Sequence, residues 1–81
     1  MPVSQIVGPS VPDEAVLLFV EGELESSGRL DGLSTLAYLH HLGRANARQK
    51  AGLRLALAMY GERVDPSAHE MIQQALRGAE A

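Results

Sequence analysis

Four cations within eleven residues are the part of this sequence best suited to binding a charged ligand. They lie in the segment RANARQKAGLR, as Arg44, Arg48, Lys50 and Arg54. The chain around them is acidic, with a formal net charge of −3 at pH 7. Guanidinium and ammonium groups bind phosphates or carboxylates through charge-assisted hydrogen bonds. The segment is therefore either a binding site for an anionic partner or the hydrated surface of a helix.

The spacing of these cations argues against a DNA-binding face. On a helix, Arg44 and Arg48 form one row, and Lys50 and Arg54 form a second row on another side of the helix. DNA-binding domains concentrate their cations on one side, and single-strand binders interleave aromatic residues that stack on bases. This segment has neither feature. We expect the cations to pair with Glu21, Glu23 or Glu25, or to dock on an acidic protein, and DNA binding is the disfavoured alternative.

The histidines lack the spacing of metal ligands. His40 and His41 are adjacent, as are His69 and Glu70, whereas two ligands on a helix are normally three or four residues apart. We expect no metal site. We expect His40 to be partly buried beside leucines, and His41 to be exposed.

No catalytic constellation is recognisable. The chain has no cysteine, its serines lie in cap or loop contexts, and no glycine-rich phosphate loop occurs. The acids of the EGELE segment, residues 21–25, alternate at i+2, which scatters them around a helix. A chain of 81 residues also has little room for a concave pocket. We therefore expect no enzymatic activity and no cofactor.

The composition indicates an all-α fold. Aromatic residues are limited to Phe19, Tyr38 and Tyr60, whereas sheets favour aromatic and β-branched residues. We predict a small bundle of three to four short helices over residues 12–81, preceded by an extended or disordered arm at residues 1–11. The absence of cysteine fits a reducing compartment, and no apolar run is long enough to span a membrane. We expect a cytoplasmic protein.

Start and stop residues delimit the first two predicted helices. Pro12 opens the helix over residues 13–27 and Gly28 ends it, although the run AVLLFV could also form a strand. Asp31 is expected to cap the second helix, which Gly43 ends. In that helix Leu33, Leu36, Ala37 and His40 share one side and Leu39 and Leu42 the other, which predicts packing between two neighbours.

The remaining two helices follow the same logic. The third is expected from Ala45 to Tyr60, with Gly61 ending it. Asp65 and Pro66 form a clear start signal for the fourth, which Gly78 ends. Its apolar residues recur at helical spacing on one side: Ala68, Met71, Ile72, Ala75 and Leu76. We find no internal repeat at a spacing of 20–50 residues.

The apolar residues outnumber what one small bundle can bury. Residues 13–20, 33–42 and 51–60 carry them on more than one helix face, and a domain of this size has a thin core. We therefore expect a non-enzymatic interaction module, such as an adaptor, an escort chaperone or an inhibitor, that pairs with itself or with a larger protein. The alternative is a small dimeric DNA-binding regulator that uses residues 44–54.

Helix-in-groove burial is the expected mode of binding. The four cations would set the orientation of the partner, and six apolar residues would supply the contact area: Leu53, Leu57, Tyr60, Met71, Ile72 and Leu76. Residues 1–43 carry six acids and one base, and residues 44–81 carry four acids and six bases. The two halves should therefore attract each other, within one chain or between two.

Overall fold

The computed structural model describes residues 11–78, so the predicted arm lies outside the described residues except for Val11. The described part is all helical apart from its connections, which confirms the predicted fold class. Its elements are α2 (Glu14–Ser27), α3 (Gly32–Leu42), α4 (Ala47–Tyr60), the short 3₁₀ helix η2 (Gly61–Arg63) and α5 (Pro66–Gly78).

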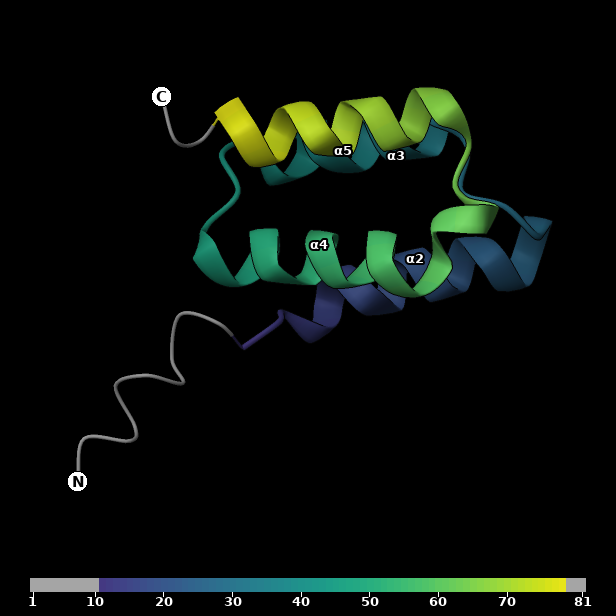
Figure 1. Cartoon of the computed structure of the whole chain (residues 1–81), viewed down its shortest axis with the longest axis horizontal. Coiled ribbons are helices and arrows are strands. Elements are labelled where there is room, and N and C mark those ends of the chain that lie inside the picture. The colour runs from purple at the N-terminus through teal and green to yellow at the C-terminus, as the bar shows by residue number, and fades with distance from the viewer. Residues whose placement is uncertain (1–10, 79–81) are drawn as a thin grey trace.

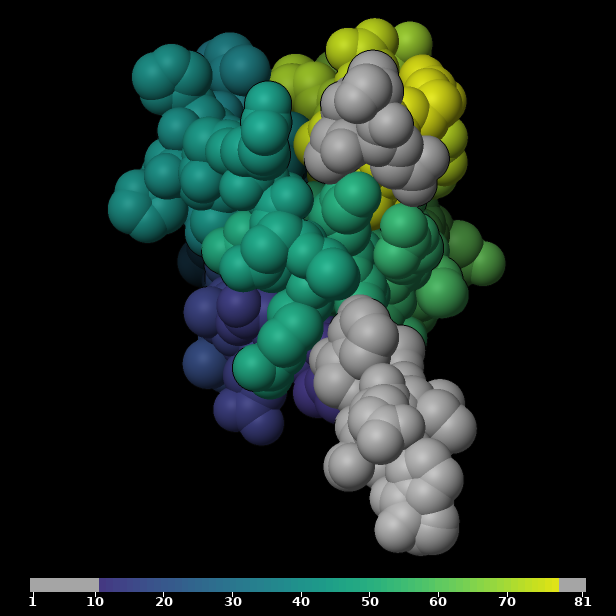
Figure 2. Space-filling view, turned by 90° about the vertical axis from the view of Figure 1, so that its left-hand side faces the viewer, coloured from purple at the N-terminus to yellow at the C-terminus, as the bar shows by residue number. Residues whose placement is uncertain are grey.

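The helices form two layers of two (Figure 1). Helix α2 packs beside α4, and α3 packs beside α5, while α4 also contacts α5 across the layers. The two helices of each layer run in the same direction, opposite to those of the other layer (Figure 1). Figure 2 shows the four helices nearly end-on, with α3 and α5 above α2 and α4. Every connection along the chain therefore crosses from one layer to the other.

The run AVLLFV, for which a strand was the alternative, is part of helix α2. Its N-cap is Asp13, whose carboxylate accepts the Ala15 N–H at 2.8 Å, so the helix begins after Pro12 and not with it. Val16, Val20 and Leu24 are buried, and this spacing places them on one helical face. At the other end Gly28 adopts a left-handed conformation with φ 82°, which favours glycine.

Helix α3 has the predicted ends, with Asp31 accepting the Ser34 N–H at 2.7 Å and Gly43 as the C-cap. Only one of its two apolar sides packs within the chain. Thr35 is buried on that side, and Tyr38 stacks on Phe19 of α2 with ring centroids 4.0 Å apart. The other side is exposed. It includes His40, so the expected partial burial of His40 is wrong, whereas His41 is exposed as predicted.

Helix α4 begins later than predicted. Asn46 is its N-cap, and the Asn46 and Gln49 side chains accept each other's backbone N–H at 2.7 and 2.9 Å. This reciprocal capping box satisfies two N–H groups of the kind that the start of a helix leaves without a partner in the helix. The other end is as predicted, because α4 ends at Tyr60 with Gly61 as its C-cap, and the chain continues directly into η2.

The connections between α2 and α3 and between α4 and α5 lie side by side at one end of the bundle. Leu30 and Val64 form a parallel β-bridge. The Leu30 N–H donates to the Arg63 carbonyl, and the Asp65 N–H donates to the Leu30 carbonyl, both at 2.9 Å. Each bridge residue stands between an arginine and an aspartate, Arg-Leu-Asp in one connection and Arg-Val-Asp in the other. The structure thus reveals a short repeat that the sequence analysis missed.

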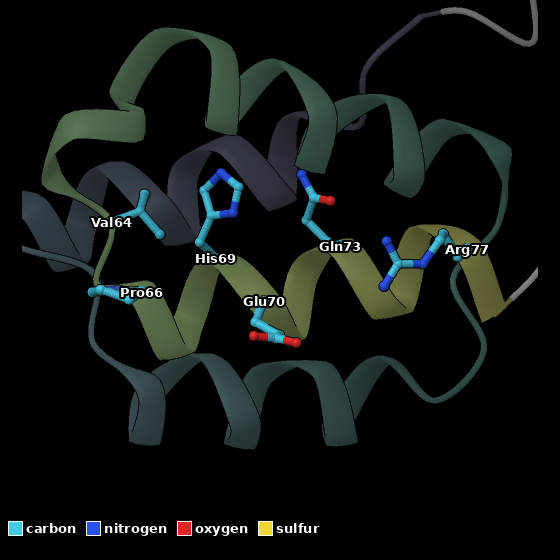
Figure 3. Close-up of a pocket in the computed structure, with 6 residues that line it drawn as sticks. All are labelled: Val64, Pro66, His69, Glu70, Gln73 and Arg77. Atoms are coloured by element: carbon cyan, nitrogen blue, oxygen red, sulfur yellow. The ribbon is translucent and has the colours of Figure 1, made fainter.

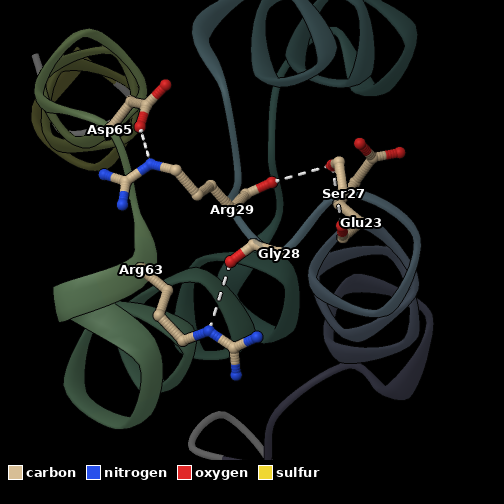
Figure 4. A network of polar contacts seen from close by, with 6 residues as sticks. All are labelled: Glu23, Ser27, Gly28, Arg29, Arg63 and Asp65. Atoms are coloured by element: carbon tan, nitrogen blue, oxygen red, sulfur yellow. Dashed lines mark hydrogen bonds and ion pairs between the residues drawn. The ribbon is translucent and has the colours of Figure 1, made fainter.

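Side chains reinforce this junction (Figure 4). Arg29 forms an ion pair with Asp65 through its Nε atom, and Arg63 Nε donates to the Gly28 carbonyl at 3.2 Å. The ion pair joins a base of the acidic half to an acid of the basic half. The expected pairing of the cation cluster with Glu21, Glu23 or Glu25 is not found among the described residues.

Burial of Leu30 should dominate the stability of the junction. Leu30 has 0% exposure and Leu33, three residues later, has 82%. We expect Leu30→Ala to lower the free energy of unfolding by about 2–5 kcal/mol, because it leaves a cavity in the core. Leu33→Ala, the matched control, should change it by less than about 0.5 kcal/mol. Urea unfolding in dilute solution measures both, and equal losses would contradict the central position of Leu30.

Gly52 permits the close contact of α4 with α2. A Cβ atom at this position would lie 3.0 Å from the Val16 Cβ and 3.2 Å from the Asp13 carbonyl oxygen, whereas one at Gly22 would meet nothing within 4 Å. We expect Gly52→Val to lower the free energy of unfolding by about 1–3 kcal/mol through overpacking. Gly22→Val should alter it by less than about 0.5 kcal/mol. Thermal unfolding of the two variants provides the comparison, and similar stabilities would refute the steric argument.

Candidate functional site

A concave surface runs along α5 and is lined by α4 as well in its second part. It consists of two adjacent hollows of about 500 and 530 Å³ that share Gln73 and Arg77. The first hollow is further lined by Val64, Pro66, His69 and Glu70, and the second by Arg54, Leu57 and Leu76. We call this surface, Arg54, Leu57, His69, Gln73, Leu76 and Arg77, the α4–α5 groove.

The burial of α5 positions the polar side of the groove. Ala68 and Ile72 are fully buried, and the residue after each is rotated by about 100° around the helix. Figure 3 accordingly shows His69 and Gln73 pointing toward α4, while Glu70 points away from it. Arg77 continues the row one turn beyond Gln73. The core packing of α5 therefore turns a row at i, i+4 and i+8 toward α4.

The floor of the groove is apolar and its rim is cationic. Leu57 and Leu76 are partly buried and pack against the core cluster. Arg54 and Arg77 are exposed at the same hollow. A leucine-lined floor favours an apolar side chain of a ligand, and guanidinium groups favour carboxylates beside it. Glu70 brings a negative charge to the opposite end, near Pro66.

The structure separates the apolar residues that sequence reasoning assigned to partner binding. Leu57 and Leu76 line the groove. Leu53 and Ile72 are only 2% and 1% exposed, so their side chains belong to the core and are not available to a partner of the folded chain. This corrects their predicted role. Met71 lies on the far side of α5, next to Gly32 of α3.

The cation cluster does not form one surface. Arg44 precedes the N-cap of α4, so it is not on the helix. Arg48 Nε donates to the Val11 carbonyl at 3.3 Å, and the Arg48 carbonyl accepts the Asp13 N–H at 3.0 Å. Arg48 thus fastens the chain before α2 to α4. Lys50 is partly buried, and Arg54 alone of the four lines the groove.

Sequence reasoning missed His69, Gln73 and Arg77 as groove residues. They lie outside the apolar stripe of the last helix, which was the only feature that assigned its residues to a contact. Their spacing at i, i+4 and i+8 gave a usable signal. The spacing did not identify the helix that packs against this side, because nothing in the local pattern of α5 indicates that α4 lies there.

Tyr60, the last predicted contact residue, faces α2 and not the groove. Its hydroxyl donates to Glu21 Oε2 at 2.7 Å. This bond lies in a separate hollow, outside the groove, that Leu24, Glu25 and Arg63 also line. The hydrogen bond to Glu21 is the main cause of a raised Tyr60 pKa; desolvation and the Glu21 charge raise it further, and Arg63 lowers it. The pKa of Tyr38 is also raised, by burial and then by the charge of Asp13.

Two further searches concern metals and membranes. Within residues 11–78, no three His, Cys, Asp or Glu residues are grouped so that they could hold a metal ion. In the same range, no helix combines the length and apolar character needed to cross a membrane.

Comparison with protein families, with curated proteins and with solved structures finds no match to this chain. The groove and the surfaces around it are therefore the features from which a function can be proposed.

The tyrosine–glutamate hydrogen bond can be tested by titration. The neutral Tyr60 hydroxyl donates to Glu21, so ionisation of Tyr60 loses this bond and places two negative charges together. We expect Glu21→Gln to lower the Tyr60 pKa toward its ordinary value of 10.0. Glu25→Gln, a charge change in the same hollow, should leave it almost unchanged. Phenolate absorbance of a Tyr38→Phe background follows Tyr60 alone, and equal shifts in both variants would contradict the assigned cause.

Proposed function

We propose that this chain is a small protein-interaction module that binds an acidic segment of a larger protein in the α4–α5 groove. The classes of protein that fit are an adaptor, an escort chaperone or an inhibitor. The observation that supports the proposal is the presence of Leu57 and Leu76 in the same hollow as Arg54 and Arg77. This combination suits a segment that presents apolar side chains with carboxylates beside them.

The two kinds of contact contribute in different ways. Burial of an apolar anchor over the leucines contributes about 25 cal/mol per Å² of apolar surface removed from water. The two exposed guanidinium groups contribute more to orientation and association rate than to affinity. A short amphipathic helix meets both requirements, because residues at i, i+3, i+4 and i+7 share one face. Binding should weaken as salt rises, since the charges at the rim are exposed.

DNA binding is the weaker alternative. The cluster that suggested it is divided among a residue outside the helix (Arg44), a structural contact (Arg48) and the groove (Arg54). The acids of α2 add a repulsive surface next to α4, with Glu21 hydrogen-bonded to Tyr60. A duplex would therefore meet few phosphate-binding cations on any one side.

A binding experiment with designed peptides tests the proposal. The probe is a labelled amphipathic peptide with leucines at helical spacing and glutamates on its other positions. We expect it to bind, and we expect the double variant Arg54→Glu with Arg77→Glu to lose roughly tenfold or more in affinity, because charge repulsion replaces attraction at the rim. Fluorescence anisotropy at physiological salt measures the affinity.

Two controls separate groove binding from general charge attraction. Arg48→Glu alters a cation outside the groove and should leave affinity within about twofold, and a peptide with lysines in place of glutamates should not bind. A labelled DNA duplex should show no binding at about 150 mM salt, whereas a steep salt-dependent affinity would favour the regulator alternative. Failure of the acidic peptide to bind, or equal losses in all charge variants, would overturn the proposal.

A further inference from the structure

The outward side of α3 carries the most exposed large apolar residue of the described chain, Leu33, together with a second exposed leucine, Leu36. Leu33 and Leu36 are 82% and 53% exposed, and Ala37 and His40 on the same side are exposed as well. These positions follow the spacing i, i+3, i+4 and i+7 of one helical face. Helix α3 forms one corner of the bundle (Figure 2), so this face is open to a second molecule.

The face carries no formally charged side chain. No Asp, Glu, Lys or Arg occurs between Gly32 and Leu42. On the adjoining edge of α5, Ser67 and Met71 lie next to Gly32, and Gln74 continues their row one turn later. Exposed Glu70 is the charged residue next to this row, so only α3 itself offers a charged partner no ion-pairing group. A second copy of the same face would meet no like-charge repulsion.

Opposite charges stand at the two ends of α3. Asp31 is its N-cap and Arg44 follows its C-cap. When two copies of the helix pair antiparallel, each Asp31 approaches the Arg44 of the other copy. A parallel pairing would instead bring like charges together at both ends. Asp31 and Arg44 therefore complement each other in the antiparallel orientation, and Arg29 beside Asp31 is already ion-paired with Asp65.

We propose that two copies of this chain associate through the outward face of α3, antiparallel about a two-fold axis that passes near Leu36 and Ala37. Leu33 of each copy packs against His40 of the other, and Leu36 packs near the axis. An isologous contact of this kind closes after two copies and does not propagate. This surface is separate from the α4–α5 groove, so the proposal stands or fails independently of the proposed function.

The other exposed leucine does not suit the same role. Leu18 on α2 is 66% exposed, but Glu14, Glu21 and Glu25 lie four residues before it, three after it and seven after it. They therefore share its helical face. Two copies meeting through that face would oppose like charges. Leu18 is thus a matched control of similar exposure.

The size of the contact predicts a weak dimer. One helix pair with the edge of α5 buries less than the roughly 1,200 Å² of a standard stable interface. We expect a dissociation constant in the micromolar range. Sedimentation over a dilution series should show the chain change from one copy to two as concentration rises. Leu36→Glu should weaken association roughly 30-fold or more, whereas Leu18→Glu should leave it within about twofold.

Single cysteines test the orientation, because the natural chain has none. In the antiparallel dimer, Leu36→Cys should form an intermolecular disulfide under mild oxidation. Leu33→Cys should not link to itself, but it should link to His40→Cys when the two variants are mixed. Circular dichroism confirms that each variant is folded, and Leu18→Cys controls for random collision.

Several outcomes would overturn the proposal. A single copy at all concentrations up to about 1 mM would do so, as would equal weakening by Leu36→Glu and Leu18→Glu. Efficient self-linking of Leu33→Cys would replace the antiparallel arrangement with a parallel one. None of these results bears on the peptide affinity of the α4–α5 groove, because Arg54 and Arg77 lie on other helices.

Discussion

The contact between the two connections at one end of the bundle determines the arrangement of the helices. Leu30 is fully buried there, and both its N–H and its carbonyl are bonded to the segment around Val64. Because the two connections run parallel and leave the same layer at the same end, α2 and α4 must run in one direction and α3 and α5 in the other. Helices α4 and α5 then lie against each other, and the α4–α5 groove forms between them.

The same arrangement explains why one face of α3 remains open. Helix α4 packs on α2 through Gly52 and also contacts α5, so two of its sides are covered. Helix α3 packs on α5 and meets α2 through the stacked rings of Phe19 and Tyr38. A four-helix square gives each helix two inward and two outward sides. On α3, two leucines stand on an outward side.

Local signals in the sequence were sufficient for the elements but not for their pairing. Asp31, Gly28, Gly43 and Pro66 act locally, through side-chain caps, left-handed backbone or a fixed φ, and the helix ends they predicted were found within a few residues. The start of α4 was misjudged because the cap depends on Asn46 and Gln49 together. The Arg29–Asp65 ion pair joins residues far apart in the chain, and helical periodicity carries no information about such contacts.

The candidate site shows the same division between local and long-range information. Leu53 and Ile72 were assigned to a partner because periodicity identifies an apolar face but does not say what covers it. In the structure the chain itself covers that face, with Leu53 and Ile72 almost fully buried. Exposed apolar residues are found in each of the three ranges that were expected to carry a surplus, at Leu18, at Leu33 and Leu36, and at Met59. Burial thus removes Leu53 and Ile72 from the expected contact and leaves Leu57 and Leu76 at the groove.

The two proposed surfaces complement each other. Charge is concentrated at the rim of the groove and absent from the outward face of α3, so the first suits selection of a partner and the second suits self-association. A dimer formed through α3 would carry two copies of the groove. Two weak sites held together bind a partner with two acidic segments far more tightly than one site does, because the second contact becomes intramolecular. Weak self-association would then make binding depend on the concentration of the chain itself, which gives a small module a graded response without any change in its fold.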